Sequence, residues 1–390
     1  MKDEEERLPA CLESLTAIRE ILKEVCIYDT GSSDATVAIA QQFGCHVQQG
    51  HWDDDFARAR NESLAMASTE WVLWIDADER LQVDATRLAQ VLKETSKRVS
   101  LYGVHLVNRG PNGAELGIQR LPRLFRRGCY SFAGGLHEKP VHLDHGYREE
   151  TALLPMEIVL LRHEGYADVD SCVAKSTRNI EIALKELEQA PPGEEIAEMD
   201  RRRINLAKSY LIGLRYAEAI EVLTPIWRLG ATSRERHAGE LITLALLSLD
   251  ATDMALHLAE LLRGQGSDPE YCDWLIARAH HQAGRHLQAA ALLQKLSTPT
   301  DATGVVVGAT QLTGDLVLAL VAADRSEEAL AVCLTRVQKG VPGLALPLVE
   351  LWGDRDRGAL WQLLSSLGPH VLADVRAQIR GVLDKEEIPT

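Results

Sequence analysis

Apolar and polar positions divide the chain into two parts with different periods. In the first part, short apolar runs alternate with stretches of helical spacing. The clearest run, residues 71–75, has no polar member, which is typical of a strand covered on both faces in a parallel sheet. Further strands are predicted at 24–28 and 44–48, and helices at 6–23, 36–43 and 55–68. Repeated strand, loop, helix units predict a right-handed parallel sheet.

From about residue 173 the chain is predicted to be almost wholly helical. Between residue 100 and that point, the pattern gives short strand candidates such as residues 100–107. The stretch Ala190-Pro-Pro-Gly193 interrupts the helical part and marks a linker or a helix boundary. The predicted division is a catalytic domain at 1–170, a helical linker at 171–200 and helical repeats at 201–390.

Four segments in this helical part share one pattern. Each joins two helical stretches and ends on an alanine that opens the second. The segments are 214–219, 250–255, 284–289 and 324–329, with their alanines 36, 34 and 40 residues apart. A period near 34 with small residues where paired helices touch resembles the tetratricopeptide repeat. Such arrays expose a concave groove that usually holds a peptide or protein.

Composition and charge narrow the class of protein. The hydrophobic content of 46% is typical of a globular chain, and the net charge of −15 argues against a nucleic-acid partner, which favours a basic face. No apolar run approaches the roughly 20 residues of a transmembrane helix, and the first residues form no apolar signal core, so a cytoplasmic protein is expected. The seven scattered cysteines favour reduced, mostly buried thiols over disulfides or a zinc site.

Candidate chemistry begins where the run 71–75 ends in Asp76, Asp78 and Glu79. In parallel sheets, ligands bind beyond the carboxyl ends of the strands. Asp76 and Asp78 are two positions apart, so their side chains point the same way if the chain stays extended. Two convergent carboxylates suit Mg²⁺ or Mn²⁺, which often shares its ligands with a diphosphate. A solvated acidic turn is the alternative, with Glu79 as a structural neighbour.

Two further clusters carry candidate binding residues. Asp29-Thr-Gly-Ser-Ser-Asp34 places a carboxylate at a strand end, Gly31 in a tight turn, and Ser33 or Asp34 at the start of the next helix. In the stretch 52–61, Asp55 begins a helix that presents Arg60 and Asn61 one turn later. Taken singly, each cluster also fits an ordinary capped helix.

Together with Arg123-Leu-Phe-Arg126 and Gly135-Leu-His-Glu138, these clusters resemble family 2 glycosyltransferases of the GT-A fold. More narrowly, the chain resembles a subgroup whose catalytic domain is followed by tetratricopeptide-like helices. That subgroup includes bacteriocin peptide S- and O-glycosyltransferases and lipopolysaccharide-core glucosyltransferases. The resemblance covers residues 1 to about 230. It implies an α/β GT-A domain, with a Rossmann-like and mostly parallel sheet, followed by an all-α helical-repeat domain.

The resemblance also implies a UDP-sugar donor, a divalent cation and inverting transfer. Asp29 would hold the uracil or ribose. The donor-binding residues that it implies are Glu4, Glu5, Asp29, Gly31, Asp34, Arg60, Asn61 and Asp76. Asp78 would bind the metal directly and Asp76 would share it. His163 would be a third metal ligand or would instead hold the domain junction.

Glu138, with His137 beside it, occupies the position of the family's acidic residue that faces the acceptor. Glu138 is therefore the candidate catalytic base, since inverting transfer needs a carboxylate that takes the acceptor's proton. The alternative is a salt bridge from Glu138 to Arg123 or Arg126. Arg126 and Arg127 either assist the diphosphate or belong to a solvated basic loop.

The expected activity is transfer of a hexose from a UDP-sugar to a peptide or protein side chain, with a homodimer through the repeats as a further expectation. The alternatives are transfer to lipopolysaccharide or another glycan, or a catalytically dead chain that binds partners through its repeats. Family members place an apolar strand directly before the Lys2-Asp-Glu-Glu5 segment, whereas this chain begins at Met1. We expect that strand to be encoded upstream or to have been trimmed.

Overall fold

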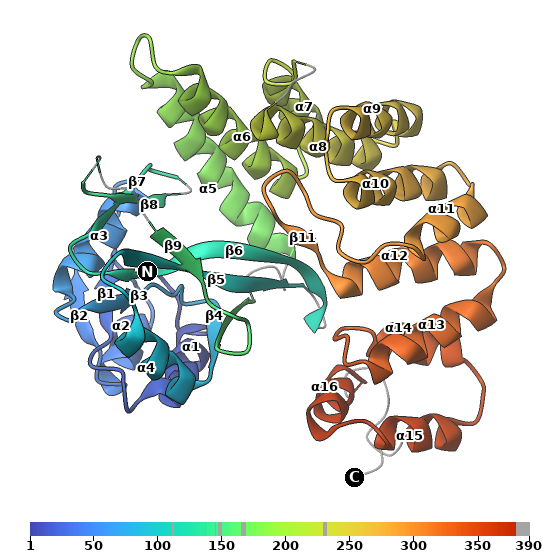
Figure 1. The fold of residues 1–390 in the computed structure, drawn as a ribbon, viewed down its shortest axis with the longest axis horizontal. Helices are drawn as coiled ribbons and strands as arrows, with labels where there is room; N and C mark the ends of the chain where they lie inside the picture. The colour runs from blue at the N-terminus through green and yellow to red at the C-terminus, as the bar shows by residue number, and fades with distance from the viewer. Residues whose placement is uncertain are drawn as a thin grey trace. The chain divides into compact units, whose positions relative to one another are not determined.

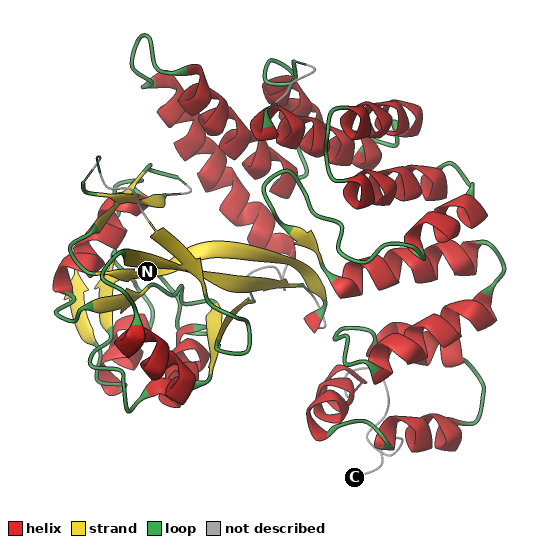
Figure 2. Ribbon diagram, viewed as in Figure 1, coloured by secondary structure: helices red, strands yellow, loops and turns green. Residues whose placement is uncertain are grey.

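The structure, a computed structural model, describes residues 1–110, 113–136, 138–144, 146, 150–164, 169–228 and 232–379. The chain forms two compact units (Figures 1 and 2). The α/β unit contains Met1–Asn108, Gln119–Gly165 and Thr177–Glu194, and the helical unit contains the remaining residues. Neither unit is continuous in sequence, because residues 109–118 belong to the helical unit and residues 177–194 to the α/β unit.

The first elements of the α/β unit follow the predicted strand and helix order. They are α1 (Leu8–Ser14), the 3₁₀-helix η1 (Leu15–Ile18), β1 (Cys26–Asp29), α2 (Thr36–Gln42), β2 (His46–Gln49), α3 (Phe56–Met66), β3 (Trp71–Leu73), β4 (Glu79–Val83) and α4 (Ala85–Glu94). The helix predicted at 6–23 is shorter than expected, because the chain tightens to a 3₁₀ turn at Leu15. Asp55 caps α3 as predicted, accepting a bond from Arg58 N at 2.9 Å.

The strands form one large sheet and two small pairs. The later strands are β5 (Val99–Arg109), β6 (Glu115–Arg126), β7 (Tyr130–Ala133), β8 (Lys139–His142), β9 (Glu150–Leu153), β10 (Val159–His163) and β11 (Val306–Val307). Parallel pairing joins β1 to β2, β5 to β9 and β5 to β10. Antiparallel pairing joins β3 to β6, β4 to β10, β6 to β11 and β7 to β8. The strands β5 and β6 are longer than the short candidates predicted after residue 100.

Side chains cover both faces of the sheet, as the unbroken apolar run predicts. Neighbouring residues of β6 show this, because successive side chains of a strand point to opposite faces. Leu124 packs in a cluster with residues of α1 and α4, such as Leu8 and Leu88. Phe125 packs in a second cluster with Ala57 of α3 and Phe132 of β7. The α/β class, with helices following the sheet domain, is confirmed.

The helical unit is a succession of helices, most of which pack on their neighbours along the chain (Figure 1). They are α6 (Ile196–Ile212), α7 (Tyr216–Leu223), α8 (Ser233–Ser248), α9 (Thr252–Gly264), α10 (Pro269–Gln282), α11 (His286–Leu293), α12 (Ala309–Ala322), α13 (Ser326–Gln338), α14 (Ala345–Trp352), α15 (Arg357–Ser365) and α16 (Pro369–Ile379). The preceding helix α5 (Val169–Glu188) is divided between the two units.

The four segments of the predicted repeat adopt the same turn. Their first residues, Leu214, Asp250, Gly284 and Asp324, all have a positive φ between 58° and 75°. In each turn the next N–H bonds to the carbonyl five residues back, at 2.8 or 2.9 Å, which closes the preceding helix as a Schellman motif does. The final alanines, 219, 255, 289 and 329, are fully buried. Small residues are therefore needed where the paired helices touch, as the sequence period predicted.

Leu214 offers a test of this turn, because a side chain with a Cβ is strained in the left-handed region. Leu214 has a φ of 58° and is 55% exposed, so its removal loses little burial. We expect Leu214→Gly to raise the free energy of unfolding by about 0.5–1 kcal/mol, measured by urea denaturation. The matched control is Gly284→Ala at the equivalent position, which should lower it by about 1 kcal/mol. Equal effects of both changes would contradict the repeat equivalence.

Candidate active site at the ends of β1 and β3

The turn after β1 is organised by the carboxylate of Asp29. The residue is fully buried, and its Oδ2 accepts bonds from Gly31 N at 3.0 Å and Ser32 N at 2.9 Å. Oδ1 accepts a bond from the Ser32 hydroxyl. Gly31 has a φ of +101°, so the tight turn needs its lack of a Cβ. The structure therefore gives Asp29 a role in shaping this loop, and its contact with a uracil or ribose stays a prediction.

The first residues of the chain lie against this turn and against the start of α2. Glu5 N donates to Asp34 Oδ2 at 3.1 Å, and Glu5 Oε2 accepts from Ala35 N at 2.8 Å. Glu4 N donates to the Thr36 hydroxyl at 2.7 Å. Asp34 Oδ1 accepts from Thr36 N at 2.9 Å, but the N-cap position of α2 is Ala35, so the predicted cap by Ser33 or Asp34 is not formed. Five of the predicted donor-binding residues, including Asp29 and Gly31, are thus brought together at one end of β1.

The chain turns sharply after β3, and this separates the two aspartates. Glu79 N donates to the Asp76 carbonyl at 3.0 Å, which closes a turn over residues 76–79. The prediction that Asp76 and Asp78 point the same way is therefore wrong, because it required an extended chain. Asp76 faces two arginines, whereas Asp78 faces His163.

Trp74 lies between the two arginines that hold Asp76. The guanidinium carbons of Arg60 and Arg123 lie 3.8 Å and 4.1 Å from the centre of its ring. Arg60 donates to Asp76 Oδ1 at 2.8 Å, and Arg123 approaches Oδ2 at 3.3 Å. Burial disfavours the charged form of Asp76, but the two arginines outweigh it and hold the pKa of this carboxyl below its usual value. The sequence analysis missed this arrangement of Trp74 and Arg123.

Glu79 is the buried counterpart of Asp76. It is only 1% exposed, accepts a bond from Arg123 Nη2 at 2.5 Å, and accepts another from Asp76 N at 2.9 Å. Burial raises the pKa of Glu79 to about 7, although Arg123 acts in the opposite direction. Its position agrees with the structural role predicted for it.

The second aspartate forms a separate pair with a histidine of β10. His163 Nε2 lies 3.4 Å from Asp78 Oδ2, and His163 Nδ1 lies 3.1 Å from Asn108 Oδ1. A partner on the second ring nitrogen is common for histidines that bind metals, because it fixes the orientation of the ring. The spacing of Asp78 and His163 therefore suits two ligands of one cation. Asp76 would have to leave its arginines to join them.

Glu138 is held by an arginine that the sequence analysis did not consider as its partner. Its Oε1 accepts a bond from Arg60 Nε, so Arg60 joins Glu138 to Asp76. The expected alternative partners are wrong, because Arg123 binds Asp76 and Glu79, and Arg126 binds Glu70. His137 lies outside the described residues.

Two other assignments are changed by the structure. Both groups of the Asn61 amide bond to the backbone of Phe132, at 2.9 and 2.8 Å, so Asn61 fixes β7 to α3. Its contact with the nucleoside stays a prediction. Arg126 lies opposite Trp71 in the β3–β6 pairing, which is the end of β3 away from Asp76. The interpretation in which Arg126 assists the diphosphate is therefore wrong.

The clusters on β1 and β3 lie near one another. The Met1 amino group donates to the Tyr28 carbonyl at 2.8 Å. Burial lowers the pKa of this amino group, Asp29 and Asp76 raise it, and Arg60 lowers it. Asp29, Arg60 and Asp76 thus all act on one group, which indicates that the ends of β1 and β3 lie near one another.

The loop that carries Glu138 is anchored by Glu186 of α5. Glu186 Oε1 accepts bonds from Gly135 N at 2.7 Å and Leu136 N at 3.1 Å. A Cβ at Gly135 would lie 2.6 Å from that oxygen, so the glycine permits this contact. No motif in the sequence indicated Glu186, because it lies 51 residues from Gly135.

We expect Glu186→Ala to reduce the turnover of any transfer reaction about tenfold or more, because a loosened loop misplaces Glu138. The measurement is steady-state kinetics together with a thermal melt. Glu188→Ala removes an exposed carboxylate two residues further along the same helix and is the matched control. If both variants had the same kcat, Glu186 would have no positioning role.

A separate apolar cavity of about 400 Å³ lies beside β1 and β3. Its lining includes Ile18, Val25, Trp71 and Leu73, with Arg60 also on its wall. Among the described residues, β1 pairs only with β2 and β3 pairs only with β6. The lining contains none of Asp29, Asp76 and Asp78, so we do not place the donor in this cavity.

Comparison with known proteins identifies the family of the N-terminal part of the chain. Residues 1–144 match the model of a family described as glycosyl transferase family 2. The N-terminal part of this chain is a family 2 glycosyltransferase domain. The match includes Asp29, Arg60, Asp76, Asp78 and Glu138 of the site.

Three curated proteins are similar to parts of this chain. It is 35% identical over 127 residues to a TPR repeat-containing protein of Synechococcus elongatus, covering 32% of this chain and 30% of that protein. It is 26% identical over 205 residues to the SPbeta prophage-derived glycosyltransferase SunS of Bacillus subtilis, covering 48% and 44%. It is 31% identical over 150 residues to the lipopolysaccharide core biosynthesis glycosyltransferase LpsC of Rhizobium meliloti, covering 35% and 53%. The chain thus spans about a third to a half of the length of these relatives.

Two other findings bear on expectations from the sequence. All seven cysteines lie among the described residues and are free thiols. Three are buried and four are half-buried, so the prediction that most of them are buried is wrong. Within the described part of the chain, no helix is both long and apolar enough to span a membrane.

Proposed function

We propose that the chain is a metal-dependent inverting glycosyltransferase that moves a hexose from a UDP-sugar to a peptide or protein side chain. The observation that carries this proposal is the bridge by Arg60 between Asp76 and Glu138. The bridge places the candidate base beside the carboxylate of the strand end, within the domain that matches family 2. In this proposal the nucleoside of the donor binds at the turn after β1, which Asp29 organises.

In the proposed reaction, Glu138 takes the proton of the acceptor as the acceptor atom attacks the anomeric carbon. The bond from that carbon to the diphosphate oxygen breaks, and UDP leaves with the electron pair. Asp78 and His163 would hold the divalent cation, which stabilises the growing charge of the leaving diphosphate. Arg60 keeps Glu138 in position. The Arg60 guanidinium lies over the Trp74 ring, which helps to hold it between the two carboxylates.

The acceptor class rests on the relatives and on the helical unit. SunS, LpsC and the TPR repeat-containing protein are similar to parts of this chain. Repeats of paired helices commonly present a surface for a peptide or protein, which favours that acceptor. The name of LpsC favours a second candidate, transfer to a lipopolysaccharide or another glycan.

One assay separates these candidates. The chain is incubated with UDP-hexoses and Mn²⁺, and UDP release is measured with a peptide containing Cys and Ser, with a core oligosaccharide, or with neither. We expect the peptide to stimulate release and the chelator EDTA to stop it. Stimulation by the oligosaccharide alone would favour the glycan transferase. Calorimetry that shows no Mn²⁺-dependent UDP binding would contradict any transferase and leave a repeat-based binding protein.

A further inference from the structure

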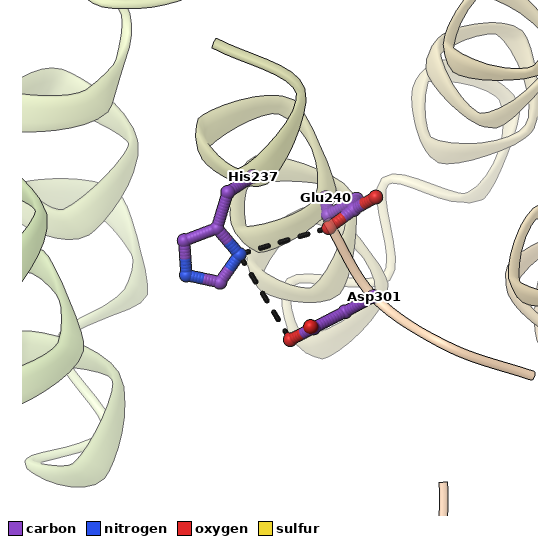
Figure 3. A group of neighbouring side chains, drawn as sticks. All are labelled: His237, Glu240 and Asp301. Atoms are coloured by element: carbon purple, nitrogen blue, oxygen red, sulfur yellow. Dashed lines mark ion pairs between the residues drawn. The ribbon is translucent and has the colours of Figure 1, made fainter. Parts of the chain in front are cut away.

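We propose that the helical unit holds a divalent transition metal, of which Zn²⁺ is the best match, between His237, Glu240 and Asp301. His237 and Glu240 are three residues apart on α8, so they lie on the same face of that helix. Asp301 comes from the segment between α11 and β11. Figure 3 shows the His237 ring facing both carboxylates. Among the described residues, this is the group of three whose ligand atoms all lie within 4.8 Å of one another.

The distances fit ligands of one ion better than they fit hydrogen bonds. His237 Nδ1 lies 3.6 Å from Glu240 Oε2 and 3.9 Å from Asp301 Oδ2. Both separations are too long for hydrogen bonds. Two ligands at the usual zinc distances of about 2.1 Å and a tetrahedral angle lie about 3.4 Å apart. A small inward movement would therefore place all three atoms around one zinc ion.

The histidine is buried without a hydrogen-bond partner. It is 5% exposed, and neither ring nitrogen has a hydrogen bond in the structure. A buried polar group without a partner costs free energy, so such a group in a native fold needs an explanation. An ion bound at Nδ1 provides one. Imidazole with two carboxylates also favours zinc over Mg²⁺ or Ca²⁺, which prefer oxygen ligands alone.

The two carboxylates are held in place by other groups, as metal ligands usually are. Asp301 Oδ1 accepts bonds from Thr303 N at 2.8 Å and Val305 N at 2.9 Å, which leaves Oδ2 on the side of His237. Glu240 accepts bonds from the Ser267 hydroxyl at 3.1 Å and Ala302 N at 2.9 Å. These hydrogen bonds therefore hold both carboxylates in position beside His237.

The local charge also favours a cation. Glu240 is 1% exposed and Asp301 is mostly buried, and His237 is the only basic group of the described residues that forms an ion pair with either. Lys208, Tyr271 and Cys272 also interact electrostatically with one or both of these carboxylates. Asp301 also lines a cavity of about 270 Å³, which offers an entry route and room for water as a further ligand. A bound ion would tie the segment carrying β11 to α8.

The test is zinc binding to the full chain after removal of metals, followed by calorimetry and by the visible absorption of bound Co²⁺. We expect one equivalent of Zn²⁺ that persists in Asp78→Asn, because that variant affects only the proposed catalytic metal. Asp301→Asn should lower the affinity for this Zn²⁺ at least about 100-fold. Loss of a ligand costs no less affinity than loss of a group that hydrogen-bonds to a ligand. The visible bands of bound Co²⁺ report its coordination geometry, so they should change in Asp301→Asn.

Controls keep the result independent of folding and of catalysis. Asp301→Asn retains an oxygen that can accept the bonds from Thr303 and Val305, and a circular dichroism melt checks its fold. Glu270→Gln is the matched control, because Glu270 also binds the backbone of this connecting segment, at Ser297 and Thr298. Zinc binding that is unchanged in Asp301→Asn would overturn the proposal. It would also be overturned if the wild type bound only the Zn²⁺ that is lost in Asp78→Asn. Failure of transferase activity would leave this result unaffected.

Discussion

Asp78→Ala is expected to abolish both sugar transfer and hydrolysis of the UDP-sugar donor while leaving the fold intact. Asp78 pairs with His163 in the structure, and its side chain is mostly buried at the end of the turn after β3. If these two residues hold the cation, removal of the carboxylate leaves the charge of the departing diphosphate without its main stabilisation. Loss of one preorganised electrostatic group typically costs about 10²–10³ in kcat, and loss of a metal ligand costs at least as much.

The measurement for Asp78→Ala is UDP release with Mn²⁺, compared with a thermal melt of the same sample. Glu70→Gln is the matched control, because Glu70 is an exposed carboxylate directly before the first residue of β3, whereas Asp78 follows the last. Activity of Asp78→Ala near the wild-type value, or wild-type activity that survives EDTA, would remove the metal role. The melt separates this outcome from simple unfolding.

Arg123→Met is expected to have the largest effect on stability, lowering the free energy of unfolding by about 3–5 kcal/mol at pH 8. The Arg123 side chain is nearly inaccessible, and its loss leaves the buried Glu79 without a cation. Asp76 keeps Arg60, so the uncompensated charge falls on Glu79. Methionine fills a similar volume, which limits the contribution of a cavity.

The pH dependence of this loss follows from Glu79. Its pKa is raised to about 7 in the folded chain, above the usual value of a glutamate. The protonated folded form is therefore favoured, and its contribution to stability is present below about pH 4.3 and is lost as the pH rises through 7. Without Arg123 the pKa of Glu79 should rise further, so Arg123→Met should be much closer to the wild type at pH 5 than at pH 8.

Urea denaturation at the two pH values measures this difference. The double variant Arg123→Met, Glu79→Gln carries no buried charge at these two positions and should recover most of the stability at pH 8. A loss in Arg123→Met that is the same at pH 5 and pH 8, with no recovery in the double variant, would contradict the assignment of Glu79 as the destabilising charge.

The elements and the repeat could be predicted because they depend on neighbours in sequence. Apolar runs of strand length and helical spacing located β1, β3, α2 and α3 to within a few residues. The period of the four alanines predicted the contact points between paired helices, because a close contact that recurs along the chain needs a small residue at the same position of each repeat. The left-handed residue that opens each turn was not predicted, since only one of the four is a glycine.

The order of residues along the chain is enough to locate the acidic clusters after the strands and to show their resemblance to a known family. How those charges pair depends on the folded chain. Glu138 meets Arg60 across 78 positions and Glu186 meets Gly135 across 51, and no local pattern encodes such contacts. The direction of Asp78 was decided by a turn that competes with an extended strand. His237 and Asp301 likewise converge only through the packing of the segment before β11 on α8, because charge pairing in a buried site depends on distance in space.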